Sequence, residues 1–361
     1  MTLKDLSHYR LYNQRISKTS FKTPEEVIMW QGAIQAQDYL AGLWAIGLRM
    51  QHPTEIDVEQ ALCNKTIVRT WPLRGTLHFV CATDVHWMIE LTAPRLLSYH
   101  AQRLLKDYEL DEKVIVRCKK VLTSVLQKKK QLTRDAVYNT LEKANIAVKN
   151  QRGLQILWRL AQDKLICFGA RQGKQQTFVL LDDWIPKSKS YTRDESLAEL
   201  ATRYFTSHGP ATLQDFTWWS GLAPRDAKAG LEMIKSKLIH EQVAEQVYWM
   251  SSKTKMLLGP SVHLLPSFDE YLIAYSDRVA SLDVTKFQNV VTKNGIFNPI
   301  VVMNGKVTGT WKRILNKNSV EIDITPFTAF AKTQKKIIDD AAKRYGFFLN
   351  KELSVVRSKK N

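Results

Sequence analysis

Two glutamines, Gln35 and Gln37, lie two residues apart in the run Gln31–Tyr39 (QGAIQAQDY). A glutamine amide is not a general base. Its carbonyl oxygen can, however, accept a hydrogen bond from a water molecule, hold that water for attack and stabilise a developing cation. Such a pair suits a reaction whose leaving group departs without a strong acid. We therefore take Gln35 and Gln37 as candidate catalytic residues; the alternative is two capping or surface glutamines.

The element that must position this pair is predicted to be an amphipathic helix. Its start is indicated by Thr23-Pro24-Glu25-Glu26, where threonine caps, proline occupies the first turn and glutamate follows three residues after the cap. On a regular helix, residues two apart point to nearly opposite sides. Both amides can face one site only if the helix ends or distorts near Gln37.

A second constellation is Val68–Leu77 (VRTWPLRGTL), which is typical of a strand, a tight turn and a returning strand. Arginine and an aromatic side chain on such a hairpin can grip phosphate and stack on a base or sugar. We take Arg69, Trp71 and Arg74 as candidate DNA-binding residues, with a structural hairpin and a core Trp71 as the alternative. His78 follows, and we expect a core histidine bonded to backbone rather than a catalytic one.

A third constellation is Leu264–Tyr271 (LLPSFDEY), in which two carboxylates follow a predicted strand. Asp269 and Glu270 indicate either a polar site or a helix start. The alternative is helix capping by Asp269 together with an ion pair to Arg278. The candidates for holding the catalytic glutamines in place without contacting the substrate are therefore His78, Asp269, Glu270 and Arg278.

The composition excludes several classes of protein. The chain has 361 residues, 44% hydrophobic, with a net charge of +18. It has no apolar run of the about 18 residues that a membrane span needs, and no apolar signal region in Met1–Asn13, so we expect a cytoplasmic protein associated with the nucleoid. The four cysteines form no CxxC, and the histidines show no HxxxH or HExxH spacing. We expect no metal and no cofactor.

The basic excess is spread through the chain rather than confined to a tail. That distribution favours a basic surface facing a polyanion such as nucleic acid. The alternative is a basic but otherwise ordinary enzyme.

The predicted elements repeat an order of helices followed by a hairpin, which is the winged-helix pattern. We predict an α+β fold with three tandem winged-helix motifs (helix-turn-helix plus β-wing) and a C-terminal β-rich subdomain, in which Asn304-Gly305 forms a hairpin turn and Arg357-Ser358-Lys359-Lys360 a disordered tail. The predicted divisions are 1–90 for the first winged helix with the glutamine pair, 91–130 for a helical connector, 131–190 and 191–256 for the second and third winged helices, and 257–361 for the β subdomain and a terminal helix. Within them we predict hairpin strands at Ile239–Val243 and Gln246–Met250, a strand at Val291–Thr292, and a terminal helix from about Pro326 to Arg344.

Four motifs resemble the AlkZ-type winged-helix DNA glycosylases, in the same order and over roughly residues 5–345. They are QAQD, RTWPLRGTLHFV, LLPSFDEYLIAYSDR and NGIFNPIVVMNGKVTGTWKR. The resemblance implies that the three winged helices form a concave basic channel, and that the family's motif glutamines correspond to Gln35 and Gln37. A sister branch has aspartate in the second place, and this chain does not. The last motif adds Lys312 and Arg313 to the candidate DNA-binding residues.

The activity implied by the resemblance is hydrolysis of the N-glycosidic bond of N7-alkylated guanine, including bulky adducts and interstrand crosslinks. An N7-alkylguanine is cationic and leaves without protonation, so positioning a water and stabilising an oxocarbenium-like sugar is the main task. We expect a monomeric, monofunctional enzyme without lyase activity, whose partner is duplex DNA carrying alkylated purines. The alternatives are a winged-helix transcriptional regulator and a non-catalytic lesion binder.

Overall fold

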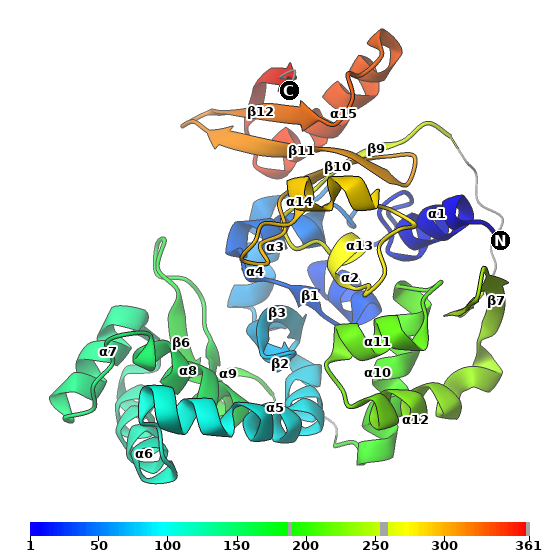
Figure 1. Cartoon of the computed structure of the whole chain (residues 1–361). Coiled ribbons are helices and arrows are strands. Elements are labelled where there is room, and N and C mark those ends of the chain that lie inside the picture. The colour runs from blue at the N-terminus through cyan, green and yellow to red at the C-terminus, as the bar shows by residue number, and fades with distance from the viewer. Residues whose placement is uncertain (187–189, 253–258, 359–361) are drawn as a thin grey trace.

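Four small sheets and the helices packed on them make up residues 1–186, 190–252 and 259–358, which this computed structural model describes. Figure 1 shows the C-terminal strands and helix at the top, with two helical groups below them on either side of the N-terminal elements. Among the described residues, no helix combines the length and the apolar composition that a membrane span requires.

After the first helix, α1, the N-terminal part has the order helix, strand, helix, helix, strand, strand, and the three strands form an antiparallel sheet in the order β1-β3-β2. This order is consistent with the predicted winged helix. The elements are α1 (Leu3–Asn13), α2 (Pro24–Gln31), β1 (Ile34–Gln35), α3 (Tyr39–Gly47), α4 (Glu55–Cys63), β2 (Ile67–Leu73), β3 (Thr76–Cys81) and the 3-10 turn η1 (Ala82–Asp84).

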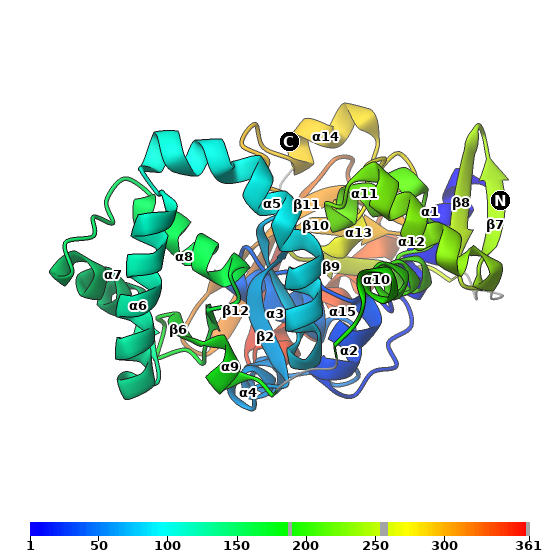
Figure 2. The same ribbon diagram turned by 90° about the horizontal axis from the view of Figure 1, so that it is seen from below.

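The same order occurs twice more. The second copy has its strands in the order β4-β6-β5, and in the third an isolated bridge between Ala211 and Trp249 takes the place of the first strand. The elements are α5 (Val85–Tyr108), α6 (Glu112–Lys129), β4 (Leu132–Thr133), α7 (Arg134–Lys143), α8 (Arg152–Gln162), β5 (Ile166–Phe168), β6 (Thr177–Leu180) and α9 (Leu181–Trp184), then α10 (Arg193–Ser207), α11 (Leu213–Ser220), α12 (Pro224–Ile234), η2 (Lys235–Lys237), β7 (Ile239–Val243) and β8 (Gln246–Met250). Figure 2 shows α5 running between the two helical groups.

The C-terminal part is a five-stranded sheet in the order β13-β12-β11-β10-β9, with α15 packed on it. The predicted turn at Asn304-Gly305 is confirmed: both residues have positive φ, 49° and 80°, between two paired strands. The elements are β9 (Val262–Leu265), α13 (Glu270–Ile273), η3 (Val284–Lys286), α14 (Phe287–Val290), β10 (Ile300–Met303), β11 (Lys306–Leu315), β12 (Ser319–Pro326), α15 (Lys332–Phe348) and β13 (Glu352–Ser358).

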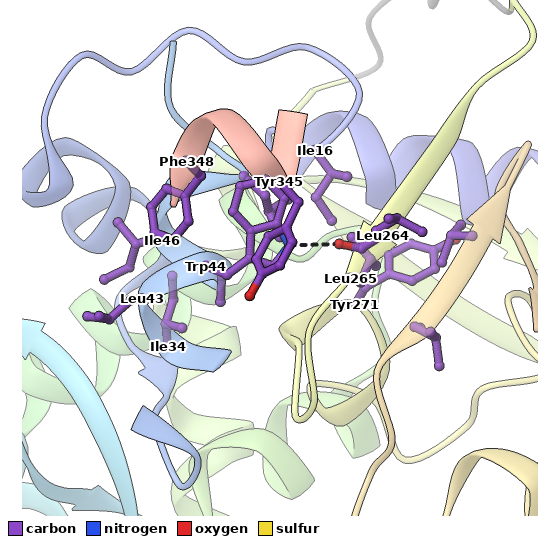
Figure 3. Close-up of a cluster of buried hydrophobic side chains, with 14 of the residues drawn as sticks. Ile16, Ile34, Leu43, Trp44, Ile46, Leu264, Leu265, Tyr271, Tyr345 and Phe348 are labelled. Carbon is purple, nitrogen blue, oxygen red and sulfur yellow. Dashed lines mark hydrogen bonds between the residues drawn. The ribbon is translucent and has the colours of Figure 1, made fainter. Parts of the chain in front are cut away.

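One hydrophobic core joins the N-terminal elements to the C-terminal sheet. Trp44 on α3 donates its ring N–H to the carbonyl of Leu264 on β9 at 2.8 Å, and it packs against Tyr345 and Phe348 of α15 at centroid distances of 5.1 and 5.0 Å (Figure 3). Because burying these aromatic rings stabilises both parts together, the segment that carries the glutamine pair is held against the C-terminal part.

Several predicted elements are wrong. Val291–Thr292 forms no strand, because α14 ends there and only a bridge between Val291 and Phe297 follows. The terminal helix begins at Lys332 rather than Pro326, which still belongs to β12. Arg357 and Ser358 are ordered in β13, which pairs in parallel with β12, whereas Lys359, Lys360 and the predicted boundary at 257 lie outside the described residues.

Candidate active site

Gln35 is the last residue of the two-residue strand β1, and Gln37 lies in the bend between β1 and α3; neither is at the end of a helix, which corrects the prediction. Helix α2 ends at Gln31, and Gly32 takes the positive φ of 79° that closes it. β1 then pairs Gln35 with His78 of β3, and the N–H of Ala36 donates to Leu77 at 2.7 Å. On extended backbone, residues two apart point to the same side. Gln35 lies on the strand and Gln37 in the bend directly after it, and both side chains line the same groove.

Both glutamines line one groove of about 550 Å³. Gln35 is 8% exposed, while Gln37 is in the exposed class. The other walls come from the β2–β3 hairpin, from α5, α7 and α8 of the neighbouring helical group, and from the loop at Asn294–Ile296. The groove thus runs between parts of the chain that are distant in sequence.

Gln35 is fixed through both its backbone and its side chain. Its N–H donates to Oε1 of Glu270 at 2.8 Å, and its Oε1 accepts from Nη2 of Arg74 at 2.9 Å. Glu270 is fully buried and also accepts from Nε1 of Trp219 at 3.0 Å. Burial alone would raise the pKa of Glu270, but contact with His208 and the positive charge of Arg74 outweigh burial and lower it. Glu270 is therefore an ionised carboxylate directly behind the glutamine pair.

Gln37 is held more loosely. Its Oε1 lies 3.5 Å from the N–H of Leu77, which is a long hydrogen bond, and its backbone carbonyl accepts from Arg69 at 3.4 Å. The amide oxygen of Gln37 is thus oriented but largely free for a further partner.

Arg74 forms the turn of the β2–β3 hairpin together with Gly75, and both residues have positive φ, 53° and 70°. The twist of such a two-residue turn matches the right-handed twist of the two strands that it joins. A non-glycine residue adopts the positive φ of this turn at a cost of about 1–2 kcal/mol. The guanidinium is half-buried and donates inward, to the carbonyl of Trp219 and to Gln35. This arrangement does not fit the prediction that Arg74 contacts DNA.

His78 is fully buried, and burial together with the nearby charge of Arg74 lowers its pKa to about 3. The neutral ring donates from Nδ1 to the carbonyl of Thr76 at 2.9 Å, which leaves Nε2 as an acceptor 3.4 Å from Nη2 of Arg74. The predicted core histidine bonded to backbone is confirmed, and it supports Arg74.

Arg69 and Trp71 are also buried, at 6% and 5% exposed. Arg69 donates from Nε and Nη2 to the carbonyl of Ala36, at 3.1 and 2.7 Å, and so braces the glutamine segment. Trp71 packs on Phe168 with ring centroids 5.0 Å apart. Direct phosphate contact by Arg69, and base stacking by Trp71, do not fit this burial; the core alternative fits Trp71.

The predicted ion pair between Asp269 and Arg278 is wrong. Asp269 caps α13 by accepting from Tyr271 N at 2.9 Å, as expected, but both of its oxygens accept from Arg49 at 3.0 Å in a buried pair. Arg278 instead donates to the carbonyl of Leu272 at 2.8 Å. Asp269 thus fixes the chain just before Glu270, and Arg278 is not among the described residues that line the groove.

Lys312 and Arg313 do not line the groove of the glutamines. They line a neighbouring pocket of about 240 Å³ that reaches the glutamine segment only at Asp38. Lys312 is exposed, and Arg313 donates to the hydroxyl of Tyr345 at 2.5 Å.

The groove has cationic side chains that sequence reasoning missed. Arg103 on α5 and Arg134 at the start of α7 are both exposed and line it. Neither belongs to a motif, and only the packing of the second helical group against the hairpin brings them to the glutamines. Within the described residues, no group of three or more histidine, cysteine, aspartate or glutamate side chains is arranged to hold a metal ion.

Comparison with known proteins gives a family match and a fold match. Residues 28–348 match the family model described as "DNA glycosylase AlkZ-like". The chain is 22% identical over 360 residues to the interstrand DNA cross-link repair glycosylase of Streptomyces sahachiroi, with 92% of this chain and 93% of that protein covered. Its fold is similar to the solved structure of Streptomyces sahachiroi DNA glycosylase AlkZ, with a TM-score of 0.82 at 19% identity, covering 99% of this chain and 100% of the other.

Proposed function

Because this chain belongs to the AlkZ-like family of DNA glycosylases, we propose that it hydrolyses the N-glycosidic bond of N7-alkylated purines in duplex DNA. Gln35 and Gln37 position the attacking water. The observation that carries the proposal is the presence of both amides in one groove, with exposed arginines along its wall.

The chemistry needs little acid–base assistance. The oxygen of water attacks C1′ of the sugar, the C1′–N9 bond breaks, and its electron pair neutralises the cationic base. The water's remaining extra proton passes to solvent. The amide carbonyl of Gln37 stabilises the oxocarbenium-like sugar, and the buried negative charge of Glu270 behind Gln35 also favours a cation there.

The groove also suits a duplex rather than a single small molecule. Its walls come from the hairpin and from α5, α7 and α8, and Arg103 and Arg134 can each approach a phosphate. The named relative is a cross-link repair glycosylase, and we extend the proposed substrates to bulky and cross-linked N7 adducts. The three winged-helix divisions and a monomeric state belong to the same proposal.

The test is base release. Purified protein is incubated with duplex DNA carrying N7-methylguanine, and the free base is measured by mass spectrometry beside the Gln35→Ala/Gln37→Ala double variant. Release by the wild type and not by the variant supports the proposal. Tight duplex binding without release, on this substrate and on a cross-linked duplex, would instead point to a lesion binder.

A further inference from the structure

We infer that Arg74 is a positioning residue that gives the two glutamines opposite hydrogen-bonding roles. Gln35 presents a donor to the groove and Gln37 presents an acceptor. The inference rests on the proposed function, because it assigns the part that each amide plays in that site.

The role of Gln35 follows from what Arg74 is able to do. A guanidinium only donates hydrogen bonds, so the Gln35 atom that faces it at 2.9 Å must be the carbonyl oxygen. The amide nitrogen then points away from Arg74. Within the part of the chain that the structure describes, Nε2 of Gln35 has no hydrogen-bond partner, and Gln35 lines the groove. It is a free donor there.

The role of Gln37 follows in the same way. The backbone N–H of Leu77 also only donates, so it faces the carbonyl oxygen of Gln37. At 3.5 Å this bond is long enough to orient the amide without saturating its oxygen. Gln37 therefore offers an acceptor on the same side as the donor of Gln35.

Arg74 is built into a fixed position. It donates to the carbonyl of Trp219 in the last turn of α11, where the helix dipole favours a cation. Gly221 covers it closely, since a Cβ at that position would lie 3.1 Å from Cγ of Arg74 and 3.2 Å from its backbone nitrogen. His78 accepts from the remaining side, at 3.4 Å.

A donor and an acceptor side by side are what a single water needs. The water oxygen accepts from Gln35, one water hydrogen is donated to Gln37, and the second lone pair is left to attack C1′. If Arg74 is lost, the Gln35 amide is free to turn over and present its carbonyl oxygen, so the water is no longer held between one donor and one acceptor and its lone pair is no longer directed at C1′. Arg74 thus controls the chemical step and not the binding of DNA.

The test is a double-mutant cycle with Arg74→Met, Gln35→Ala and the combined variant. The N7-methylguanine release rate is measured in single turnover at protein concentrations that saturate the duplex, and duplex Kd is measured at several salt concentrations. Arg103→Met is the contrasting variant for DNA binding: it removes an exposed groove arginine and should weaken Kd and flatten its salt slope. Thermal unfolding checks folding, and if Arg74→Met is unfolded, Arg74→Lys takes its place in the cycle.

We expect Arg74→Met to slow release by about 10²-fold with Kd and its salt slope unchanged, and to have no further effect in the Gln35→Ala background. A weaker Kd with a flatter salt slope and an unchanged release rate would overturn the inference, as would additive losses in the combined variant. If the wild-type protein releases no N7-methylguanine, the proposed function itself fails; if Gln35→Ala releases the base at the wild-type rate, the role assigned to Gln35 fails.

Discussion

Oε1 of Glu270 lies 2.8 Å from the backbone nitrogen of Gln35, across 235 positions of sequence. This hydrogen bond ties the two-residue strand β1 to the start of α13 in the C-terminal part. A buried carboxylate that accepts from a backbone N–H is a strong constraint. The geometry of the glutamine pair therefore depends on the C-terminal part as well as on the N-terminal part, α1 to η1, that carries the pair.

The donor and acceptor roles predict opposite results for two conservative substitutions. Gln35→Glu keeps an acceptor for Arg74 but removes the donor in the groove, and we expect base release to fall by about 10²–10³-fold. Gln37→Glu keeps the acceptor and adds negative charge near the oxocarbenium ion, and we expect release to stay within about tenfold of wild type. The measurement is the single-turnover release rate of each variant. A slower release by Gln37→Glu than by Gln35→Glu would contradict the assigned roles.

The groove arginines are predicted to bind phosphate. Arg103→Ala removes one cation, so the slope of log K against log salt should become shallower by about 0.9, while the saturated release rate stays unchanged. Lys343 on α15 is also exposed but lies outside the groove. The control variant is therefore Lys343→Ala, which should not change the slope of log K against log salt. An equal slope for Arg103→Ala and wild type would place α5 away from the DNA.

Buried histidines predict how stability depends on pH. The pKa of His78 is about 3 in the folded protein and about 6.5 when unfolded, so between these values the unfolded chain binds a proton that the folded chain does not. The free energy of unfolding should therefore fall as pH drops below about 6.5, by up to about 1.4 kcal/mol per pH unit for this residue. His263, whose pKa is lowered to about 4 by burial, adds to the same trend.

Urea unfolding at pH 7 and pH 5 measures this effect. His78→Asn should lose less stability than wild type between the two pH values, whereas His52→Asn, at an exposed position, should behave as wild type. Identical losses in wild type and His78→Asn would show that His78 does not carry the pH dependence.

The sequence predicts best what neighbouring residues decide. The cap at Thr23, the hairpin strands Ile239–Val243 and Gln246–Met250, and the turn at Asn304-Gly305 were all predicted where the structure has them. Each depends on backbone hydrogen bonds or turn chemistry within a few residues. Local patterns were sufficient for these elements.

The same reasoning failed where the partner is far along the chain. The sequence predicts a helix at Gln35 because β1 has only two residues and its sheet partner, His78, comes much later. It predicts DNA contacts for Arg69 and Arg74 because nothing near them in sequence reveals that Ala36 and Trp219 accept their hydrogen bonds. Burial of a charged side chain is decided by tertiary packing, and a hairpin motif alone does not report it.

The groove also predicts a monofunctional enzyme. Among the described residues that line it there is no lysine, so no amine is positioned to form a Schiff base with the sugar. The product should be an intact abasic site, and borohydride should trap no protein–DNA adduct. Strand cleavage without added base or a trapped adduct would contradict this prediction.

The most direct test of amide-based hydrolysis compares two lesions in one duplex sequence, cationic N7-methylguanine and neutral hypoxanthine. Two amides without an acid should release the first and not the second, because only the cationic base leaves without protonation. We predict release of N7-methylguanine by the wild type, its loss in Gln35→Ala/Gln37→Ala, and no release of hypoxanthine by either protein. Comparable release of both bases, or N7-methylguanine release that survives in the double variant, would contradict the mechanism.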